Sequence, residues 1–336
     1  MRDRIRVLSI GYGNSIQNTL RFLDQVRSSE SVREWVWHER VGRFYVDDVE
    51  FVGIVDIDCK KINSESSKIS IFRGILLDEI KILREAIGSL CTCSEDEFRR
   101  EIKDLEFDVG VIAINSGETA TSRRYAEILL EKGAAVINMT PEELARDRGL
   151  QERFLSERRI IVGDDLLSQA GGTILHKYLI RFFSERGFKV LRSYQLDVAG
   201  TLETLVTTDE SIRLKKRSIK SDSIKIEGSE RVVAGTTDYV PFLEDQRISH
   251  IFIEIMAPLN KIFKLEARYW SYDGVNAVNT LLDVIRAVAY SIREHREDLR
   301  LLEEDANIIS VYGFKAPPKI LRFEEAFKLF EERFIF

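Results

Sequence analysis

Hydrophobic positions in the first half of the chain form short continuous runs, separated by stretches with helical periodicity. The runs of Val, Ile and Leu predict buried strands, and apolar residues recur every three or four positions from Ile16 to Val26. Continuous apolar strands that alternate with helices are typical of a parallel sheet covered on both faces. The strands expected in this part are 4–10, 51–56, 107–114, 134–138 and 160–162, with helices at 16–26 and 120–132.

After Gly163 the pattern changes. A long helix is expected at 168–185, then a strand at 190–198, a basic run from Arg213 to Lys225, and two segments of period-two alternation that favour antiparallel strands. Those two segments are 250–257 and 263–271, and helices are expected at 275–295 and within 311–336. The sequence therefore predicts an α/β fold in which an α+β insertion at 166–271 interrupts a first domain of residues 1–165 and 272–336.

The link between the first strand and the first helix contains Gly11, Gly13 and Asn14. Glycines let a pyrophosphate approach the backbone, and a helix start adds N–H donors and a positive dipole end. The usual third glycine position is Ile16, so the motif is incomplete, but strand, loop and helix follow in the right order. Asp56 ends the next strand, where an acid can accept hydrogen bonds from an adenosine ribose, although a solvated loop acid would look the same. We expect a Rossmann-like NAD site in the first domain.

Composition excludes several classes of protein. The 336 residues are 44% hydrophobic with a net charge of −6, which suits a sizeable core and argues against disorder and against a dedicated nucleic-acid binder. The apolar runs are shorter than the roughly 18 residues of a membrane span. Charges at Arg2, Asp3 and Arg4 argue against a signal peptide. We expect a cytoplasmic protein that binds neither nucleic acid nor membrane.

The cysteines and histidines predict no metal ligands. The chain has only three cysteines, Cys59, Cys91 and Cys93, and this small, odd number does not suit a disulfide framework. We therefore expect ordinary thiols in a reducing cytoplasm. Cys91 and Cys93 resemble half of a metal site, but no second pair accompanies them. The four histidines are scattered, and His176, within an apolar helix, favours a packing or capping role.

Short motifs of one family follow in order along nearly the whole chain. Gly11-Tyr-Gly13-Asn14 forms a G-x-G-N loop, and the most specific stretch is Gly163-Asp164-Asp165 with Ser168 and Gln169. Further motifs are 38–52, 56–61, 116–118, 138–141, Thr173, 194–196, Gly200, Asp273 and 315–317. This ordered series resembles the inositol-3-phosphate synthases (myo-inositol-1-phosphate synthases), especially the short archaeal and bacterial forms.

The resemblance implies an NAD-dependent isomerase of inositol and phospholipid biosynthesis. Glucose 6-phosphate would become myo-inositol 3-phosphate (1L-myo-inositol 1-phosphate) by internal oxidation, enolisation, intramolecular aldol closure and reduction by the same cofactor. The inserted domain would carry catalysis and build a homotetramer. Whether a divalent cation is also needed is left open, and Asp164-Asp165 suits either a metal-binding pair or a turn.

Lysines are the candidates for the aldol chemistry. Fixed cations stabilise the negative charge of an enolate and of a substrate phosphate in a dry pocket. Lys216 and Lys220 lie four apart, on one face of a helix, and match the paired lysines of the family, while Lys315 matches a third. From its pattern alone, the run 213–225 would be a solvated basic face. The resemblance instead implies a catalytic set of Lys216, Lys220, Lys315, Arg247 and Asp273.

The resemblance also implies two binding sets. The cofactor set is Gly11, Gly13, Asn14, Asp56, Asp58, Ser116, Gly117, Asn138, Asp164 and Asp165, and the substrate set is Ser168, Gln169, Gly200, Thr201 and Glu203.

Four positions depart from the family pattern. Arg247 occupies a position where the family has lysine, and arginine is poor at proton transfer. Leu167 occupies a position where the family often has lysine. Thr201 and Glu203 replace the family's Asn and Asp. The departures bear on the substrate rather than on the fold. They motivate two alternatives, a diverged NAD(P)-dependent sugar-phosphate oxidoreductase and a non-catalytic NAD-binding homologue.

Overall fold

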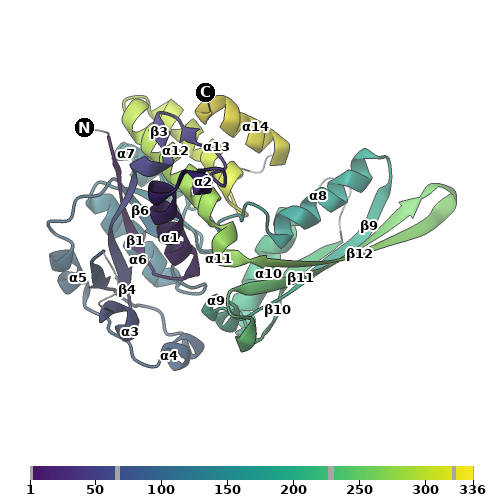
Figure 1. Cartoon of the computed structure of the whole chain (residues 1–336), viewed down its shortest axis with the longest axis horizontal. Coiled ribbons are helices and arrows are strands. Elements are labelled where there is room, and N and C mark those ends of the chain that lie inside the picture. The colour runs from purple at the N-terminus through teal and green to yellow at the C-terminus, as the bar shows by residue number, and fades with distance from the viewer. Residues whose placement is uncertain (1–2, 65–68, 226–230, 320–322, 336) are drawn as a thin grey trace. The chain divides into compact units, whose positions relative to one another are not determined.

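The computed structural model describes residues 3–64, 69–225, 231–319 and 323–335, which form two compact units. Unit 1 consists of Met1–Leu166 and Ala277–Phe336, and unit 2 of Leu167–Asn276. Unit 2 therefore interrupts unit 1 in the chain, as the colour gradient of Figure 1 shows.

Unit 1 is built on a six-stranded sheet in which all strand pairs are parallel. Alternate residues of β1 face two different cores: Val7 belongs to one and Leu8 to the other. The apolar strands are thus covered on both faces, and the predicted parallel α/β sheet is confirmed. The strand order is β5 (Ile71–Arg73), β4 (Val49–Asp56), β1 (Ile5–Ile10), β6 (Val109–Ile112), β7 (Ala135–Asn138) and β8 (Ile161–Val162).

Helices from both ends of the chain cover this sheet. One core contains side chains of α1 (Asn14–Ser28), α12 (Val278–Glu294), α13 (Leu299–Gly313) and α14 (Phe323–Phe334). The other contains side chains of α5 (Glu95–Glu101), α6 (Thr119–Glu131) and α7 (Arg148–Ser156). The remaining elements are α2 (Glu30–Arg33), β2 (Arg40–Val41), β3 (Phe44–Tyr45), η1 (Val46–Asp48), α3 (Cys59–Ile62) and α4 (Lys81–Ile87).

Unit 2 is a four-stranded mixed sheet with two helices packed on one face. The order is β10 (Val232–Tyr239), β9 (Lys189–Ala199), β11 (Gln246–Ala257) and β12 (Lys261–Tyr272). β11 pairs antiparallel with β12, as predicted, and β10 pairs parallel with β9. Side chains of α8 (Gly172–Glu185) and α10 (Glu210–Ile224) form the core with the sheet. The short elements are α9 (Leu202–Val206), η2 (Pro241–Leu243), η3 (Pro258–Asn260) and α11 (Asp273–Asn276).

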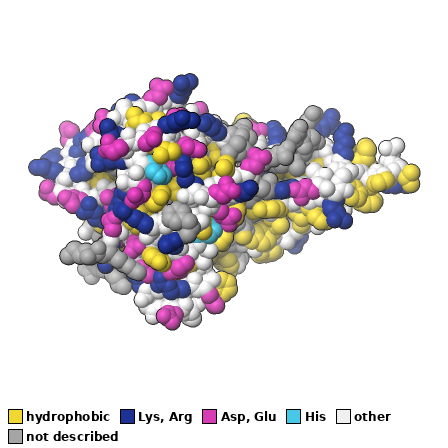
Figure 2. Space-filling model, turned by 90° about the horizontal axis from the view of Figure 1, so that it is seen from above, with side chains coloured by type: hydrophobic (Ala, Val, Ile, Leu, Met, Phe, Trp, Pro, Cys, Tyr) yellow, Lys and Arg dark blue, Asp and Glu magenta, His cyan; other side chains and the backbone are white. Residues whose placement is uncertain are grey.

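The other face of this sheet exposes large apolar side chains. Tyr194 and Leu196 alternate with buried residues along β9, and Tyr194 stacks on Phe252 with ring centroids 5.1 Å apart. Val233 and Trp270 are also exposed. Figure 2 shows apolar side chains gathered along this unit. A patch of this kind marks an interaction surface rather than ordinary solvent-facing residues.

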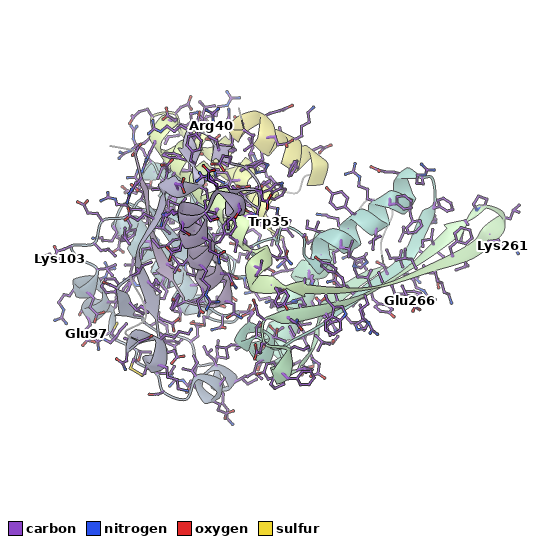
Figure 3. All side chains as sticks on the ribbon, viewed as in Figure 1. Trp35, Arg40, Glu97, Lys103, Lys261 and Glu266 are labelled. Carbon is purple, nitrogen blue, oxygen red and sulfur yellow. A yellow bond between two sulfur atoms is a disulfide. The ribbon has the colours of Figure 1, made fainter. Side chains whose placement is uncertain are left out.

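Cys59 and Cys91 are joined by a disulfide (Figure 3), so the expectation of three ordinary thiols is wrong. Cys59 begins α3 directly after β4, and Asp58 forms an isolated bridge with Leu90, which brings residues 32 positions apart together. Cysteine count and spacing do not report such a long-range contact. Cys93 keeps its thiol. A cytoplasmic location stays a prediction, and no helix of the described ranges is long and apolar enough to cross a membrane.

Alkylation of the denatured protein tests the disulfide. Iodoacetamide should modify Cys93 alone before reduction and all three cysteines after it, as counted by mass spectrometry. The Cys59→Ser/Cys91→Ser variant should lose about 3 kcal/mol of unfolding free energy, since the closed loop no longer constrains the unfolded chain. Cys93→Ser keeps the crosslink and serves as the control. Three modified cysteines without reduction would contradict the disulfide.

Candidate active site

The glycine loop between β1 and α1 has the backbone that a pyrophosphate needs. Gly11 has a φ of +108°, and a Cβ there would lie 2.3 Å from the carbonyl oxygen of Ala113, so only glycine fits. Gly13 is the N-cap of α1 and brings no side-chain cap, and a Cβ at this position would have no atom within 4 Å. Asn14 begins the helix. Open backbone at the positive end of a helix dipole fits an anionic ligand.

Asp56 anchors this loop instead of facing solvent. Its carboxylate accepts hydrogen bonds from the backbone N–H of Tyr12 at 2.9 Å and from Lys61 Nζ at 3.0 Å. Two further donors, the backbone N–H groups of residues 57 and 58, occupy the other oxygen. A carboxylate has about four acceptor positions, so Asp56 is satisfied within the fold. The half-buried Asp58, which caps α3, is the more accessible acid at this strand end.

The loops that follow β6 and β7 are held together by buried polar groups. Gly117, with a φ of +91°, donates its N–H to Glu142 Oε1 at 2.9 Å, and Ser116 beside it is buried. The buried Asn138 amide donates to the Glu142 carbonyl oxygen at 2.8 Å and to Asp164 Oδ1 at 2.7 Å. These residues therefore lie at the carboxyl ends of parallel strands, where open α/β sheets bind ligands.

Asp164 and Asp165 have different partners. The buried Asp164 carboxylate accepts from the backbone N–H of Ala145 at 2.9 Å and from Arg146 Nε at 3.1 Å, and burial raises its pKa to about 6. Asp165 accepts from Lys315 Nζ at 2.7 Å, and the Lys315 N–H donates to the Asp165 carbonyl oxygen at 2.8 Å. The first acid holds loops together, and the second fixes Lys315. Within the described residues no group of three or more His, Cys, Asp and Glu could hold a metal ion.

The two lysines of α10 are paired and largely buried. Lys216 forms an ion pair with Glu203 of α9, and Lys220 forms one with Asp197 of β9. The side chains of Lys216 and Lys220 are only 21% and 14% exposed, so a solvated basic face does not describe these two positions.

Arg247 connects two acids at the start of β11. Its guanidinium pairs with Asp273, the first residue of α11, and lies 3.5 Å from Asp197 Oδ2. Asp197 is completely buried and also accepts from Ser249 Oγ at 2.6 Å and from Gln195 Nε2 at 2.8 Å. Burial alone would raise the pKa of Asp197, but the charges of Lys220 and Arg247 hold it well below the usual range.

His176 of α8 lies in the same buried region. The ring is fully buried, and no described residue meets its nitrogens with hydrogen-bond geometry, although the Gln195 side chain lies near enough to favour the protonated ring. Burial lowers the pKa of His176 to about 4, and the nearby Lys220 charge acts in the same direction. The expected packing role fits a neutral imidazole. At Gly172, a Cβ would lie 2.4 Å from Ser249 Oγ, so only a glycine lets α8 approach the sheet this closely.

The remaining candidate substrate residues divide into two groups. Ser168 and Gln169 lie just before α8, whose N-cap Gly171 has no side-chain cap, and Glu203 contacts Lys216. Gly200 and Thr201 have structural roles: a Cβ at 200 would lie 2.4 Å from the Glu244 nitrogen, and Thr201 caps α9. Leu167, one of the four departures from the family pattern expected from the sequence, is buried.

Sequence reasoning missed Asp197 and Ser249, and it gave Gln195 only as part of the motif 194–196, without a role. A signal existed, since Ser193, Gln195 and Asp197 occupy alternate positions of one strand, all on its buried face. A row of polar residues on a buried face is costly unless other polar groups satisfy it. Such a row therefore indicates a functional or structural polar cluster.

The region around these pairs coincides with a match to a known family. A family model of myo-inositol-1-phosphate synthase matches residues 171–274, which contain Lys216, Lys220, Arg247 and Asp273. The inositol-3-phosphate synthase of Mycolicibacterium smegmatis is 28% identical over 352 residues, with 94% of each chain covered. The chain is similar to inositol-3-phosphate synthases over most of its length. The resemblance found in the motifs is thereby confirmed.

Two solved structures of synthase relatives share the fold. A myo-inositol-1-phosphate synthase-related protein from Thermotoga maritima matches with a TM-score of 0.72 at 18% identity, covering 98% of both chains. An inositol-3-phosphate synthase from Caenorhabditis elegans matches with a TM-score of 0.76 at 13% identity, covering 98% of this chain and 84% of the other. At these identities the likeness concerns architecture alone, and it confirms the α/β fold.

The neutral state of His176 predicts acid sensitivity. The folded chain resists protonation of His176 until about pH 4, whereas an unfolded histidine takes up a proton below about pH 6.5. The contribution of the neutral His176 to the unfolding free energy is therefore fully present above pH 6.5 and is lost as the pH falls toward 4. The unfolding free energy should decrease between pH 7 and pH 5 in the wild type. In His176→Leu this decrease should be smaller, by up to about 2 kcal/mol.

Urea unfolding followed by circular dichroism at both pH values measures this difference. His250→Gln is the matched control, since His250 is only half-buried on β11. Equal losses in the wild type and in His176→Leu would contradict the assignment.

Proposed function

We propose that the protein is an NAD-dependent isomerase that converts glucose 6-phosphate into myo-inositol 3-phosphate, a precursor of inositol and phospholipids. The observation that carries this proposal is the pair Lys216 and Lys220, both largely buried, both ion-paired, and both within the segment that matches the synthase family. Buried cations on one helix face suit a reaction in which negative charge develops on carbon-bound oxygens.

The glycine loop supports the cofactor part of the proposal. Gly11 and Gly13 provide the close backbone approach, and Asp58 is the acid we assign to the adenosine ribose, because the carboxylate of Asp56 is already occupied by four donors. When bound, NAD would supply reversible oxidation of the sugar. Asp56 and Asp58 make the site unfavourable for a 2′-phosphate, and pairing with Asp56 neutralises Lys61.

The start of α8 is the proposed phosphate site. Ser168 and Gln169 precede the uncapped N-terminus of this 14-residue helix, where the helix dipole favours an anion. Lys216 would add a positive charge to this site. It would leave its ion pair with Glu203, whose side chain is 33% exposed, and pair with the substrate phosphate. Arg247, always charged and well shaped for oxyanions, would bind the substrate rather than transfer protons.

The enolate step is assigned to the lysines. Lys220 would stabilise the enolate oxygen, since Asp197 holds its ammonium group in place. It would also stabilise the negative charge that moves onto the carbonyl oxygen when the enolate carbon bonds to the carbonyl carbon. Lys315, held by Asp165, is the third proposed catalytic lysine. Asp273 orients Arg247 through their ion pair.

Arg247 favours a second candidate. With arginine at a position where the family has lysine, the aldol step would lose a proton donor, which leaves a net NAD(P)-dependent oxidation of a sugar phosphate. The two candidates differ in cofactor balance. The isomerase returns its cofactor unchanged, whereas the oxidoreductase releases one reduced cofactor per turnover.

Replacement of Lys220 tests the proposal. Lys220→Ala should lower inositol phosphate formation from glucose 6-phosphate and NAD by roughly 100- to 1,000-fold while NAD binding is retained, since one charge-stabilising group is lost. Product is measured as periodate-sensitive phosphate, with and without EDTA, which also decides the metal requirement. Lys215→Ala, on the exposed side of the same helix, is the control.

Three outcomes would count against this proposal. Near-normal product formation by Lys220→Ala would remove the role of this lysine. Stoichiometric release of NADH by the wild type would favour the oxidoreductase, and a wild type with no activity on any sugar phosphate would favour the non-catalytic homologue.

We also propose a homotetramer that assembles through the exposed sheet face of unit 2. On this face Tyr194, Leu196, Val233, Phe252 and Trp270 form an apolar cluster beside the charged Arg192, Glu254 and Glu266, while α8 and α10 cover the opposite face. The hairpin of β11 and β12, with Lys261 and Glu266 labelled in Figure 3, extends this surface. A sheet face that presents the same patch in each copy suits a symmetric interface.

Light scattering measures the assembly. The wild type should show four times the 38.8 kDa chain mass, and Leu196→Glu should reduce this mass because a charge is then buried in the interface. Leu214→Glu, at an exposed position of α10, should leave the mass unchanged. A monomeric wild type at micromolar concentration would contradict the tetramer.

A further inference from the structure

The cation–carboxylate pairs of unit 2 differ in how firmly the carboxylate is held. The partner of Lys216 is Glu203, with a side chain 33% exposed, and the partner of Arg247 is Asp273, 30% exposed. Asp197, the partner of Lys220, is 0% exposed. An incoming anion can therefore displace Glu203 and Asp273, because water can solvate these partly exposed carboxylates. It cannot displace the fully buried Asp197 in this way.

Four donors from three elements fix the Asp197 carboxylate. Lys220 comes from α10, Arg247 and Ser249 from β11, and Gln195 from the same strand as the acid. These donors match the roughly four acceptor positions of a carboxylate. Removing the acid from its partners would leave an uncompensated buried charge, a change that costs several kcal/mol in proteins. Asp197 therefore keeps its place when other anions enter or leave.

We propose that Asp197 is the positioning residue of the lysine pair: a permanent buried counter-charge that fixes the Lys220 amine in place and keeps it protonated. Lys220 then acts as a fixed cation and hydrogen-bond donor rather than as a base. The inference rests on the proposed function, because Lys220 is the group assigned to the enolate oxygen. The charge of the Lys220 amine then depends on Asp197, an acid that does not contact the substrate.

The neighbouring charges make Asp197 decisive. Around Lys220 lie Lys216 on α10, Arg247 on β11, Glu203 on α9, Asp273 on α11 and the neutral His176 on α8. With Asp197 present, three cations face three carboxylates. Without the carboxylate, Lys220 loses its nearest negative charge while the positive charges of Lys216 and Arg247 remain, so it gives up its proton at a lower pH.

Competitive labelling of the amine tests the counter-charge without any substrate. Trace acetic anhydride is applied from pH 6 to pH 11, and the acetylated Lys220 peptide is quantified by mass spectrometry. In Asp197→Asn the pH of half-labelling should fall by about one unit or more relative to the wild type, since an opposite charge within hydrogen-bond distance is lost. Asp238→Asn, an exposed acid on β10, should leave it unchanged.

A second variant shifts the same midpoint in the opposite direction. Arg247→Met removes the competing cation from Asp197, so Lys220 should label at a higher pH than in the wild type. This variant keeps the proposal testable if Asp197→Asn does not fold, as judged by circular dichroism. Coincident midpoints in the wild type and in folded Asp197→Asn, or an unmoved midpoint in Arg247→Met, would overturn the proposal.

The pH profile of product formation gives the functional arm. The ratio of wild-type to Asp197→Asn activity should be roughly ten times larger at pH 9 than at pH 7, because the variant loses its Lys220 charge first. An equal loss at both pH values would indicate a merely structural role and overturn the proposal. If the wild type forms no inositol phosphate but the labelling midpoint moves, the proposed function fails while the counter-charge role of Asp197 stands.

Discussion

A cation can be buried only where a carboxylate accompanies it, and this constraint governs the candidate site. Lys216, Lys220 and Arg247 are all largely buried in unit 2, and each has an acid at ion-pair distance. In unit 1 the same holds for Lys315 and Asp165. Desolvation of either charge alone would exceed what the fold can tolerate, so acids and bases must be placed together. The positions of Glu203, Asp197, Asp273 and Asp165 are therefore as much a part of the site as the lysines.

Patterning along the chain predicted five of the six strands of the unit 1 sheet but not the short edge strand β5, and it predicted one face of α10. The strands β1, β4 and β7 are continuous apolar runs, and such runs form only when both faces are covered. The spacing of Lys216 and Lys220 placed both on one helix face, because the helical repeat alone decides it. Gly11 was also predictable, since a positive φ and a close backbone approach leave glycine as the only fit.

Long-range contacts were not predictable in the same way. The spacing of Cys59 and Cys91 does not reveal that a loop returns to β4, and Asp56 gives no sign in sequence that four donors already occupy it. Asp197 was missed because the alternating polar row of its strand does not reveal which distant cations meet it, although the row itself was visible. The helix α13 was missed too, although its residues 299–313 bury Leu302 and Ile309 in the core. In each case the decisive information is which distant segment comes near.

The interrupted order of unit 1 bears on how the protein is made. β1 to β8 leave the ribosome first, but α12, α13 and α14, which cover one face of that sheet, follow only after the whole of unit 2. During synthesis, the sheet face that carries Val7, Val109 and Ile137 therefore lacks these three helices. Unit 2 has by then been synthesised with all of its strands and helices. Chains of this kind expose apolar surface until the last helices arrive, which makes this face a natural site for chaperone contact and makes any truncation of the C-terminal helices costly.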